Sequence, residues 1–485
     1  MKKSKITAIG MTLALALPSV LGMHANASES TIDLNGDGRF NLSDMVTMRQ
    51  YLIGNADVKG NADVNNDGIV NVFDYIEMRK QLLENISTSV PEPSKTSRNL
   101  CAGIESSEIK GKEIDEPFIM GQTKFALDLL KAERKENENV LLSSYSIAQA
   151  LGMTANGAGG QTKSEMENVI GGMPLEELNE YFYTQRTSQP HNQYCKVNTA
   201  NSIWSRDTET SLINPEFIQD NVDYYNADFF SAPFDETTVD DINNWISNKT
   251  DKMINKMIEE IDDLTKMFLI NAVCFDAQWE EPYSKYQIKD YDFHAADGSI
   301  QNAEMLCSTE SYYIEDENAI GVVKSYMGKY AFAALLPNED MTLDEYIDTL
   351  TPEKLNAVLS DRKNDAMVHS KIPKFKTGYS AELNDTLSEL GMPTAFNYEK
   401  ADFFRMRPSV PHSMYIGGVL HKTFIDLNES GTKAAAATVV IMKDNGMPYF
   451  PEKEIEITLD RPFLYCIINT ETNLPLFIGT LNTLE

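Results

Sequence analysis

The pattern of apolar and polar positions begins with an apolar run, Ile6–Leu21, that follows three lysines. The run contains Pro18 and is short for a membrane span, and residues 25–27 read Ala-Asn-Ala, which suits signal peptidase. We interpret residues 1–27 as a secretory signal peptide. This predicts a secreted, extracellular product without a membrane span, because no later apolar stretch is long enough to cross a bilayer.

Residues 28–86 contain a repeat in which a polar stretch precedes apolar residues at helical spacing. The first copy joins Asp33–Asp44 to Met45–Ile53, and the second joins Asp63–Asp74 to Tyr75–Leu83. Each polar stretch has oxygen-bearing side chains at positions 1, 3, 5, 9 and 12 and a glycine at position 6, the pattern of a calcium loop. We therefore predict two calcium ions. The expected ligands are Asp33, Asn35, Asp37, Asn41 and Asp44, and Asp63, Asn65, Asp67, Asn71 and Asp74, with the carbonyls of Arg39 and Ile69.

Two features distinguish this repeat from an ordinary EF-hand. Position 12 is Asp instead of Glu, and residues 28–32 leave no room for an entering helix before the first loop. The segment resembles the dockerin module, which plugs an enzyme or accessory protein into a cohesin-bearing scaffold, the scaffoldin. The resemblance implies contact with cohesin through loop positions 10 and 11 and the following helix. In this sequence these positions are Leu42, Ser43, Met48, Arg49, Val72, Phe73, Met78 and Arg79.

The twofold repeat of this segment implies that either helix could dock. Ser43 and Phe73 occupy equivalent positions but differ in chemistry, which argues against equal affinity. Three of the four residues at loop positions 10 and 11 are apolar, unlike the Ser-Thr pairs of some dockerins. Which cohesin is recognised therefore stays open.

Residues 87–113 are rich in Ser, Thr, Pro, Glu and Lys and lack apolar periodicity, which predicts a linker. Over the whole chain, 42 Lys and Arg stand against 73 Asp and Glu, a net charge of −31. A phosphate backbone requires clustered positive charge, so we expect no nucleic-acid partner. The five cysteines are scattered and odd in number, which favours buried free thiols.

Residues 114–485 mix helical and strand-like stretches. Apolar residues follow helical spacing in Phe118–Lys131 and Asp241–Ile258. Alternating or continuous apolar runs predict strands, and these are Lys266–Phe275, Tyr330–Leu336, Ser413–Leu420, Glu454–Leu459 and Phe463–Asn469. We therefore predict one large α+β domain with a large mixed sheet.

No catalytic constellation stands out in this domain. It lacks the G-x-S-x-G and H-E-x-x-H motifs and any glycine-rich phosphate loop. Glu280 and Glu281 are a pair of carboxylates, as glycoside hydrolysis requires, but neighbours in a strand point to opposite faces and cannot flank one bond. We therefore expect that the protein is not an enzyme. A hydrolase attached to the dockerin is the rival that this reasoning disfavours.

A different signal lies near the C-terminus, in residues Glu429–Ile441. The stretch begins with a glycine at position 431, continues through four alanines and ends in β-branched residues. Four alanines favour a helix start. However, β-branched residues follow them, and Met442–Pro451 contains Asn445-Gly446 and two prolines. The pattern therefore favours an exposed loop that can slide into a sheet. If Thr432 points inward, then alternate residues after it do too.

This stretch resembles the reactive-loop hinge of the serpins, suicide inhibitors of serine and sometimes cysteine proteases. The likeness covers residues 114–485 and includes Asn139–Ile147, Asn156–Ala158, Asn198–Trp204, Asn243–Lys256, Leu269–Tyr283, Lys371–Phe375, His421-Lys422, Asp460–Phe463 and Phe477–Gly479. It implies an α+β serpin fold with large mixed β-sheets, surrounding helices and an exposed reactive loop, beside the small all-α calcium-binding dockerin. The implied hinge residues are Glu429, Gly431, Thr432, Ala434, Ala435, Ala436, Ala437 and Thr438. Lys433 departs from the glutamate that is usual in the family.

The family's usual count places the reactive bond between Asn445 and Gly446. The loop is several residues longer than usual, so other registers stay open. Lys443 would suit a trypsin-like protease, and Met442, Met447 or Tyr449 would suit a subtilisin- or chymotrypsin-like one. The resemblances together predict a secreted protease inhibitor on a cellulosome-like scaffold. The alternative is a non-inhibitory serpin that serves as a structural or binding component.

Overall fold

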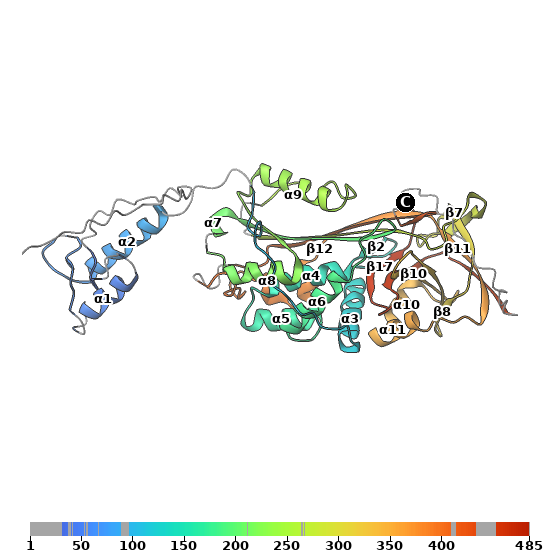
Figure 1. The fold of residues 1–485 in the computed structure, drawn as a ribbon, viewed down its shortest axis with the longest axis horizontal. Helices are drawn as coiled ribbons and strands as arrows, with labels where there is room; N and C mark the ends of the chain where they lie inside the picture. The colour runs from blue at the N-terminus through green and yellow to red at the C-terminus, as the bar shows by residue number, and fades with distance from the viewer. Residues whose placement is uncertain are drawn as a thin grey trace, which may run out of the picture. The chain divides into compact units, whose positions relative to one another are not determined.

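The computed structural model describes residues 32–36, 40, 42–52, 54, 57–65, 67–88, 97–210, 212–262, 265, 267–408, 414–432 and 453–484. The predicted signal peptide and residues 433–452, with most of the predicted hinge and the predicted reactive bond, lie outside this description. Contacts divide the chain into two compact units, Met1–Glu92 and Pro93–Glu485. Each unit is considered by itself below (Figure 1).

The first unit consists of two loop-helix pairs. Helices α1 (Leu42–Leu52) and α2 (Val72–Thr88) pack around a small core formed by Leu34, Met45, Met48, Ala62, Val64 and Met78. Both helices begin three residues earlier than the sequence pattern predicts. In the second repeat the reason is a side-chain cap, because Asn71 Oδ1 accepts the Phe73 amide at 2.7 Å.

The second unit is built on a seven-stranded mixed sheet, sheet A. Its strands, in spatial order, are β1 (Arg98–Asn99), β4 (Asp228–Ala232), β3 (Cys195–Arg206), β5 (Met267–Gln278), β14 (Gly431–Thr432), β13 (Gly418–Asn428) and β12 (Phe375–Glu382). All neighbours are antiparallel except β3–β4 and β5–β13, which are parallel. The α+β class expected from the sequence is therefore confirmed.

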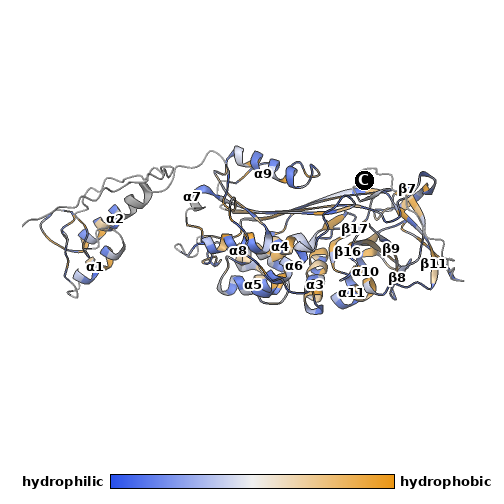
Figure 2. Cartoon of the chain, viewed as in Figure 1, coloured by the Kyte–Doolittle hydropathy of each residue, from blue (hydrophilic) through white to orange (hydrophobic). Residues whose placement is uncertain are grey.

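Two smaller sheets complete the β-structure. The six-stranded sheet B comprises β2 (Val140–Leu142), β17 (Pro475–Leu481), β16 (Phe463–Asn469), β10 (Tyr330–Pro337), β9 (Ala319–Ser325) and β8 (Tyr313–Glu315). The four-stranded sheet C comprises β15 (Lys453–Thr458), β11 (Ala366–Pro373), β7 (Ile300–Glu310) and β6 (Ile288–His294). Apolar residues dominate β16 and β17 (Figure 2), both of which are buried almost throughout.

Helices cover both faces of sheet A (Figure 1). One face carries α9 (Glu236–Lys249), and the other carries most of the remaining helices. The helices on this second face are α3 (Glu116–Glu133), α4 (Ser144–Ala155), α5 (Gly160–Ile170), α6 (Leu175–Thr187) and α8 (Pro215–Tyr225). Four shorter helices lie elsewhere in the unit: α7 (Asp207–Thr210), α10 (Leu343–Thr349), α11 (Pro352–Ser360) and α12 (Asn384–Glu389). On α9, Ile242 and Ile246 are one turn apart and bury against Trp204 and Phe268 of the sheet.

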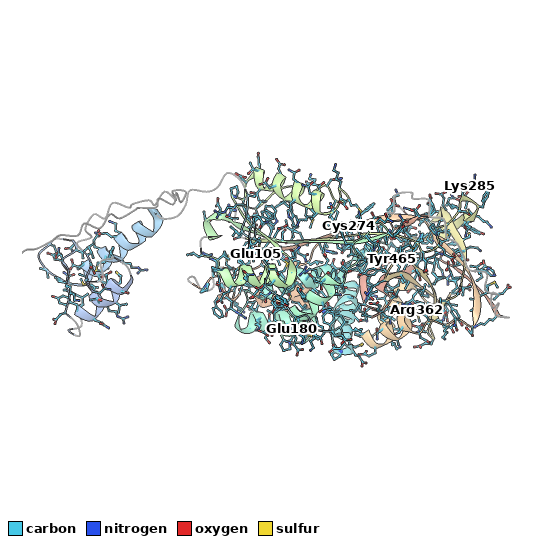
Figure 3. All side chains as sticks on the ribbon, in the orientation of Figure 1. Glu105, Glu180, Cys274, Lys285, Arg362 and Tyr465 are labelled. Atoms are coloured by element: carbon cyan, nitrogen blue, oxygen red, sulfur yellow. The ribbon has the colours of Figure 1, made fainter. Side chains whose placement is uncertain are left out.

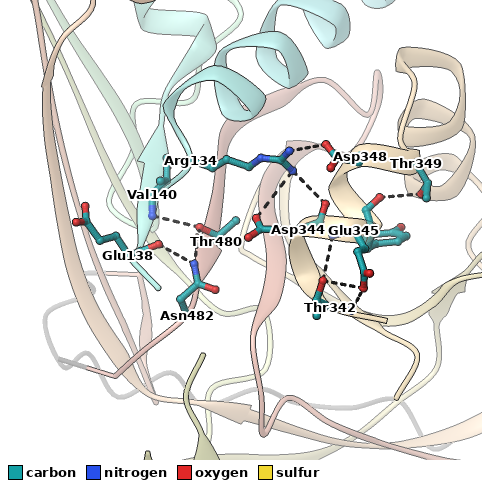
Figure 4. A network of polar contacts seen from close by, with 11 residues as sticks. Arg134, Glu138, Val140, Thr342, Asp344, Glu345, Asp348, Thr349, Thr480 and Asn482 are labelled. Atoms are coloured by element: carbon teal, nitrogen blue, oxygen red, sulfur yellow. Dashed lines mark hydrogen bonds and ion pairs between the residues drawn. The ribbon is translucent and has the colours of Figure 1, made fainter. Parts of the chain in front are cut away.

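Polar contacts link the C-terminal end of α3 to α10 and join strands β2 and β17 of sheet B (Figure 4). Arg134, the residue after α3, forms ion pairs with Asp344 (3.9 Å) and Asp348 of α10. The Val140 amide of β2 donates to Thr480 Oγ1 of β17 at 3.2 Å. In this region the C-terminal strand therefore binds to one of the earliest strands of the second unit.

Several sequence-based boundaries need correction. The predicted helix over 241–258 ends at Lys249, because Asp251 and Lys252 both adopt positive φ, which breaks helical geometry. The strand expected over 413–420 begins only at Gly418 and continues to Asn428. The other predicted helix and strands are confirmed, with ends that differ by up to three residues.

The second half of the expected linker is packed against the second unit. Residues 98–99 form β1, Leu100 N donates to Phe229 O at 2.6 Å, and Ser107 N donates to Asp223 Oδ1 at 2.7 Å. Lys112 N donates to Glu180 O. The partners of this segment belong to strands and helices that are distant in sequence, so its local composition does not reveal the packing.

The cysteines are free thiols, as the sequence predicts, and all except the half-buried Cys307 are buried. In the part of the chain that the structure describes, no helix combines the length and apolar character needed to cross a membrane.

Candidate functional site

The candidate site is a slot in sheet A between β5 and β13. At one end these strands pair directly, with Phe268–Ala272 alongside Gly418–Lys422. At the other end the two-residue strand β14 lies between them. In the described structure, Val273–Asp276 of β5 and Thr423–Asp426 of β13 are not paired with each other. The slot is therefore as wide as one strand at its β14 end and closed at the other.

The inner wall of the slot is apolar. Val273, Phe275 and Ala277 on β5 are buried in the same core cluster as Ile425 and Leu427 on β13. Alternation along each strand therefore directs Asp276 and Asp426 to the opposite face. Both aspartates are half-buried at the outer face.

The entrance of the slot holds the first residues of the predicted hinge. The Trp279 indole donates to Asn428 O at 2.8 Å, and the Trp279 amide donates to Ser430 O at 3.0 Å. The Tyr283 amide donates to Glu429 O at 2.9 Å. The turn from β13 into β14 is thus bound through its backbone, which fixes its position independently of side-chain identity.

Gly431 and Thr432 are already inside the sheet. Gly431 has φ of +149°, and a Cβ there would lie 2.0 Å from Ala277 O, so no other residue fits without displacement. Thr432 is 1% exposed, and its hydroxyl is 2.6 Å from Tyr326 OH. The sequence pattern predicted an exposed loop from this glycine onward. In the structure its first two residues are buried, because both neighbouring strands pair with them.

Lys374 ties the hinge to sheet C. Its ammonium lies 3.0 Å from the Glu429 carboxylate and 3.1 Å from that of Glu304 on β7. Burial opposes the charged form of Lys374, yet hydrogen bonds to both carboxylates raise its pKa overall. Glu429 in turn has a lowered pKa, through hydrogen bonding of its carboxylate to its own backbone and to Lys374. At neutral pH the hinge start is therefore held by an ion pair as well as by backbone bonds.

The outer face of the slot is crossed by the chain that follows α9. Asn198 of β3 donates to the Asp251 side chain at 3.2 Å, and Cys274 Sγ on β5 lies 3.4 Å from Met253 Sδ (Cys274 is labelled in Figure 3). Beyond the slot, Lys422 Nζ of β13 donates to Lys256 O at 2.7 Å. The segment therefore contacts strands on both sides of the slot, β3 and β5 on one side and β13 on the other.

The closed end of the slot contains a buried imidazole. His421 on β13 is 1% exposed, and its Nε2 accepts the Ser143 amide at 3.3 Å. Burial lowers the pKa of His421 to about 3. The ring is therefore neutral in the folded protein, as an acceptor at Nε2 requires.

The calcium loops of the first unit are described in part. Asp37, Arg39 and Asn41 lie outside the described residues, while Asp33, Asn35 and Asp44 lie within them. Asp44 is buried, and its Oδ1 accepts the amides of Leu34 and Asn35.

The second loop is described except for residue 66. Asp74 is fully buried and accepts three amides, from Val64, Asn65 and Asn71. Among the described residues, only neutral N–H groups reach this carboxylate, so a cation in the loop would supply the missing compensating charge. Among the described residues, no cluster of three or more acidic, histidine or cysteine side chains is placed to hold a metal ion. Amide and carbonyl oxygens would complete the coordination, and Asn65, Ile69 and Asn71 provide them.

Two of the residues expected to contact cohesin are buried inside the unit and are not on its surface. Met48 and Met78 are fully buried between the helices, because their positions face the core of the unit. Ser43, Arg49, Val72, Phe73 and Arg79 are exposed, and the side chain of Leu42 lies outside the description.

Sequence reasoning missed the residues that hold the hinge. Trp279 and Tyr283 follow β5, Tyr326 follows β9, and Lys374 lies between two strands of different sheets. Trp279, Tyr283 and Lys374 lie in stretches that carry the family resemblance, but no local pattern marked them as partners of the hinge. Glu280 and Glu281 lie just beyond Trp279, exposed in a bend and outside the strand in which they were expected.

Comparisons with known proteins identify both units. Residues 120–484 match the family model described as serpin (serine protease inhibitor), and residues 31–83 match the type I dockerin domain. The chain is similar to the native-state crystal structure of the thermophilic serpin tengpin, with 42% identity and a TM-score of 0.75 over 80% of this chain and 100% of that one. Serpin B4 of Homo sapiens is 30% identical, covering 74% of this chain and 97% of its own. Human leukocyte elastase inhibitor is 29% identical, with 75% and 98% coverage.

Acidification should destabilise the second unit through His421. Its pKa in the folded protein is about 3, below the ordinary 6.5, so the unfolded chain binds a proton that the folded chain does not. The stabilisation is complete above about pH 6.5 and is lost as the pH falls toward 3. We expect His421→Asn to reduce the fall in the unfolding midpoint over this range. Thermal melts at several pH values, with the exposed His294→Asn as the control, would measure it; parallel curves for wild type and His421→Asn would refute the assignment.

Proposed function

Because this chain belongs to the serpin family, we propose that it is a secreted suicide inhibitor of serine proteases that is anchored through its dockerin to a cohesin-bearing scaffold. The observation that carries the inhibitory part is the partly filled slot in sheet A, with Gly431 and Thr432 already paired on both sides. A sheet with an open strand position beside a tethered loop is prepared for one more strand.

The pairing of β14 with β5 and with β13 can be extended residue by residue beyond Thr432. Position 434 then lies opposite Phe275 and Ile425, and position 438 lies opposite Asn271 and His421. Asn271 and His421 are themselves partners where β5 and β13 pair directly. Insertion therefore needs the two strands to move apart but not to slide along each other.

The composition of the hinge suits the walls of the slot. Positions 434 and 436 would face the buried side, next to Phe275 and Val273, where alanine leaves no polar group unsatisfied. Each new backbone hydrogen bond would contribute about 0.5–1.5 kcal/mol. These bonds and the burial of the alanine side chains would together oppose the entropy cost of ordering the strand, about 1–2 kcal/mol per residue.

In the proposed reaction the protease supplies all catalytic groups. Its serine attacks the carbonyl of Asn445, the bond to Gly446 breaks, and the released amine leaves on the Gly446 side while an ester joins the protease to Asn445. The freed hinge then inserts, and the attached protease is carried away before water hydrolyses the ester. Inhibition is thus a race between insertion and deacylation. Lys443, Met442, Met447 and Tyr449 are the alternative attachment points.

Incubation with trypsin-, chymotrypsin- and subtilisin-like proteases tests the proposal. We expect a complex that survives denaturing electrophoresis, a new N-terminus at residue 446 or near it, and a higher unfolding temperature of the cleaved protein. Cleavage without a complex and without a rise in melting temperature would instead favour the non-inhibitory alternative, a structural or binding component of the scaffold.

Because hinge side chains would alternate between the buried and the outer face, the same substitution at neighbouring positions should affect inhibition differently. Ala436→Glu would place a carboxylate on the buried side between Val273 and Thr423, and should turn the inhibitor into a substrate. Ala437→Glu would point to the outer face beside Lys422 and should keep most of the inhibition. The measurement is the number of inhibitor molecules consumed for each protease inactivated. Thr432→Arg should also abolish inhibition while cleavage persists, and a stable complex with either of the two disruptive variants would contradict the inserted strand.

Lys433 should favour insertion in this chain. The shared register places position 433 between Asp276 and Asp426 on the outer face, where an ammonium would have two carboxylate neighbours. Lys433→Glu should therefore slow insertion and raise the inhibitor-to-protease ratio, more strongly at low ionic strength. Lys400→Glu, in an exposed segment, is the charge-matched control. Equal ratios for the two variants would remove Lys433 from the mechanism.

We further propose that each dockerin loop binds one calcium ion and that calcium orders the docking surface. The donor set, carboxylates and amides with one main-chain carbonyl, suits a hard cation. Asp74→Ala and Asp44→Ala should each reduce the bound calcium from two ions to one, as measured by titration calorimetry of the full chain. Chelation should lower the melting temperature of the first unit only. Unchanged stoichiometry in both variants would contradict the assignment.

A further inference from the structure

Among the described residues of the dockerin unit, the second repeat exposes more large apolar side chains than the first repeat. Among the described residues of this unit, the large apolar side chains that remain exposed are Ile69 (65%), Val72 (56%), Phe73 (64%), Ile76 (54%) and Val46 (51%). Four of these five belong to the second repeat. Exposed apolar side chains that gather in one place, unlike scattered ones, mark interaction sites.

The four residues of the second repeat form one patch at the start of α2. Val72, Phe73 and Ile76 lie within the first two turns of the helix, with Val72 and Ile76 one turn apart, and Ile69 lies in the loop three residues before the helix begins. We call these four residues the α2 patch. The opposite side of the helix carries Met78, which is fully buried in the core of the unit. The α2 patch therefore cannot turn inward without unfolding the unit.

The backbone under the α2 patch is fixed. Asn71 Oδ1 accepts the Phe73 amide at 2.7 Å, and the buried Asp74 carboxylate holds the Val64 and Asn71 amides at 2.9 and 2.8 Å. A rigid aromatic anchor loses little conformational entropy on binding, which favours it as the centre of an interface.

The first repeat lacks an equivalent anchor. Ser43 stands where the second repeat has Phe73, and it is exposed. Val46 matches Ile76 in position and exposure, so the helix surface itself is retained. The hydroxymethyl group of Ser43 offers far less apolar area than the benzyl group of Phe73. The pseudo-twofold repeat of the unit is therefore broken at the centre of its surface.

Two positively charged side chains lie on the same helix as the α2 patch. Arg79 and Lys80 are exposed on the same helix, one to two turns beyond Phe73, although the chain as a whole is strongly acidic. A matching partner would have an apolar pocket for the patch and carboxylates where these two cations meet it.

From this asymmetry we propose that the second repeat alone docks the chain, with Phe73 seated in an apolar pocket of a cohesin module, so that binding has a single orientation. The inference rests on the proposed docking function and adds which helix binds, which residue anchors it, and the chemistry of the pocket. Ile69 and Ile76 then contact the partner as well, although they were not among the residues predicted from sequence.

The test compares matched variants of the full, calcium-saturated chain against a panel of recombinant type I cohesin modules. Phe73→Asp should weaken the binding of whichever module binds wild type by at least about thirtyfold, the loss typical of a hot-spot residue. Ser43→Asp, at the equivalent position, should change the affinity by less than about twofold. Ile76→Ala should also weaken binding, whereas Val46→Ala, at the equivalent position of the first repeat, should leave the affinity nearly unchanged. Unchanged helical circular dichroism and calcium stoichiometry would show that each variant folds.

The outcomes separate this inference from its premise. Equal losses in the two aspartate variants, or a loss only when both are combined, would show that either helix docks and would overturn the single orientation while leaving scaffold docking intact. A large loss for Phe73→Asp with wild-type binding for Ser43→Asp supports the proposal. If wild type binds none of the modules, the docking function itself fails.

Discussion

Two strand edges that face each other without pairing, Val273–Asp276 on β5 and Thr423–Asp426 on β13, are the constraint on which the large unit depends. Unpaired main-chain groups in a sheet interior are costly, so this arrangement persists only if other contacts oppose its closure. The contacts are found at both ends. At the open end the Trp279 indole donates to Asn428 O and the Trp279 amide donates to Ser430 O, and at the closed end the Ser143 amide donates to His421 Nε2.

The same constraint explains why the surrounding polar contacts are placed where they are. Lys374 binds the carboxylate at the start of the hinge, and Lys422 holds the segment that crosses the outer face of the slot. Both contacts are partly exposed and therefore individually weak. Several weak contacts of this kind would oppose the proposed rearrangement less than one strong bond would.

The dockerin unit has the opposite physical character. Its helices begin inside the loops, its buried aspartates are held by backbone amides, and its apolar surface points outward from a fixed frame. The part of the molecule proposed to change shape and the part proposed to bind a partner thus fold as separate units.

Local patterns were sufficient wherever a feature depends on residues close in sequence. The calcium-loop repeat, the α+β class and the run of small residues after Gly431 all follow from spacing and residue type, because they reflect backbone geometry or one-sided burial. Features that depend on distant partners were not predictable in this way. Residues 97–113 have the composition of a linker yet pack on β4, α8 and α6. Met48 and Met78 lie on helices whose inward side is defined only by the packing of one helix on the other.

The sequence by itself therefore determined the run of small residues after Gly431 and the repeated polar loops of the dockerin unit, since both are properties of a few consecutive residues. Tertiary structure alone decided that Gly431 and Thr432 are already inserted, that an open strand position follows them, and which aspartates line it. The physical reason is that a gap in a sheet is a relation between β5 and β13, which lie about 150 residues apart along the chain, and no local pattern encodes the distance between them.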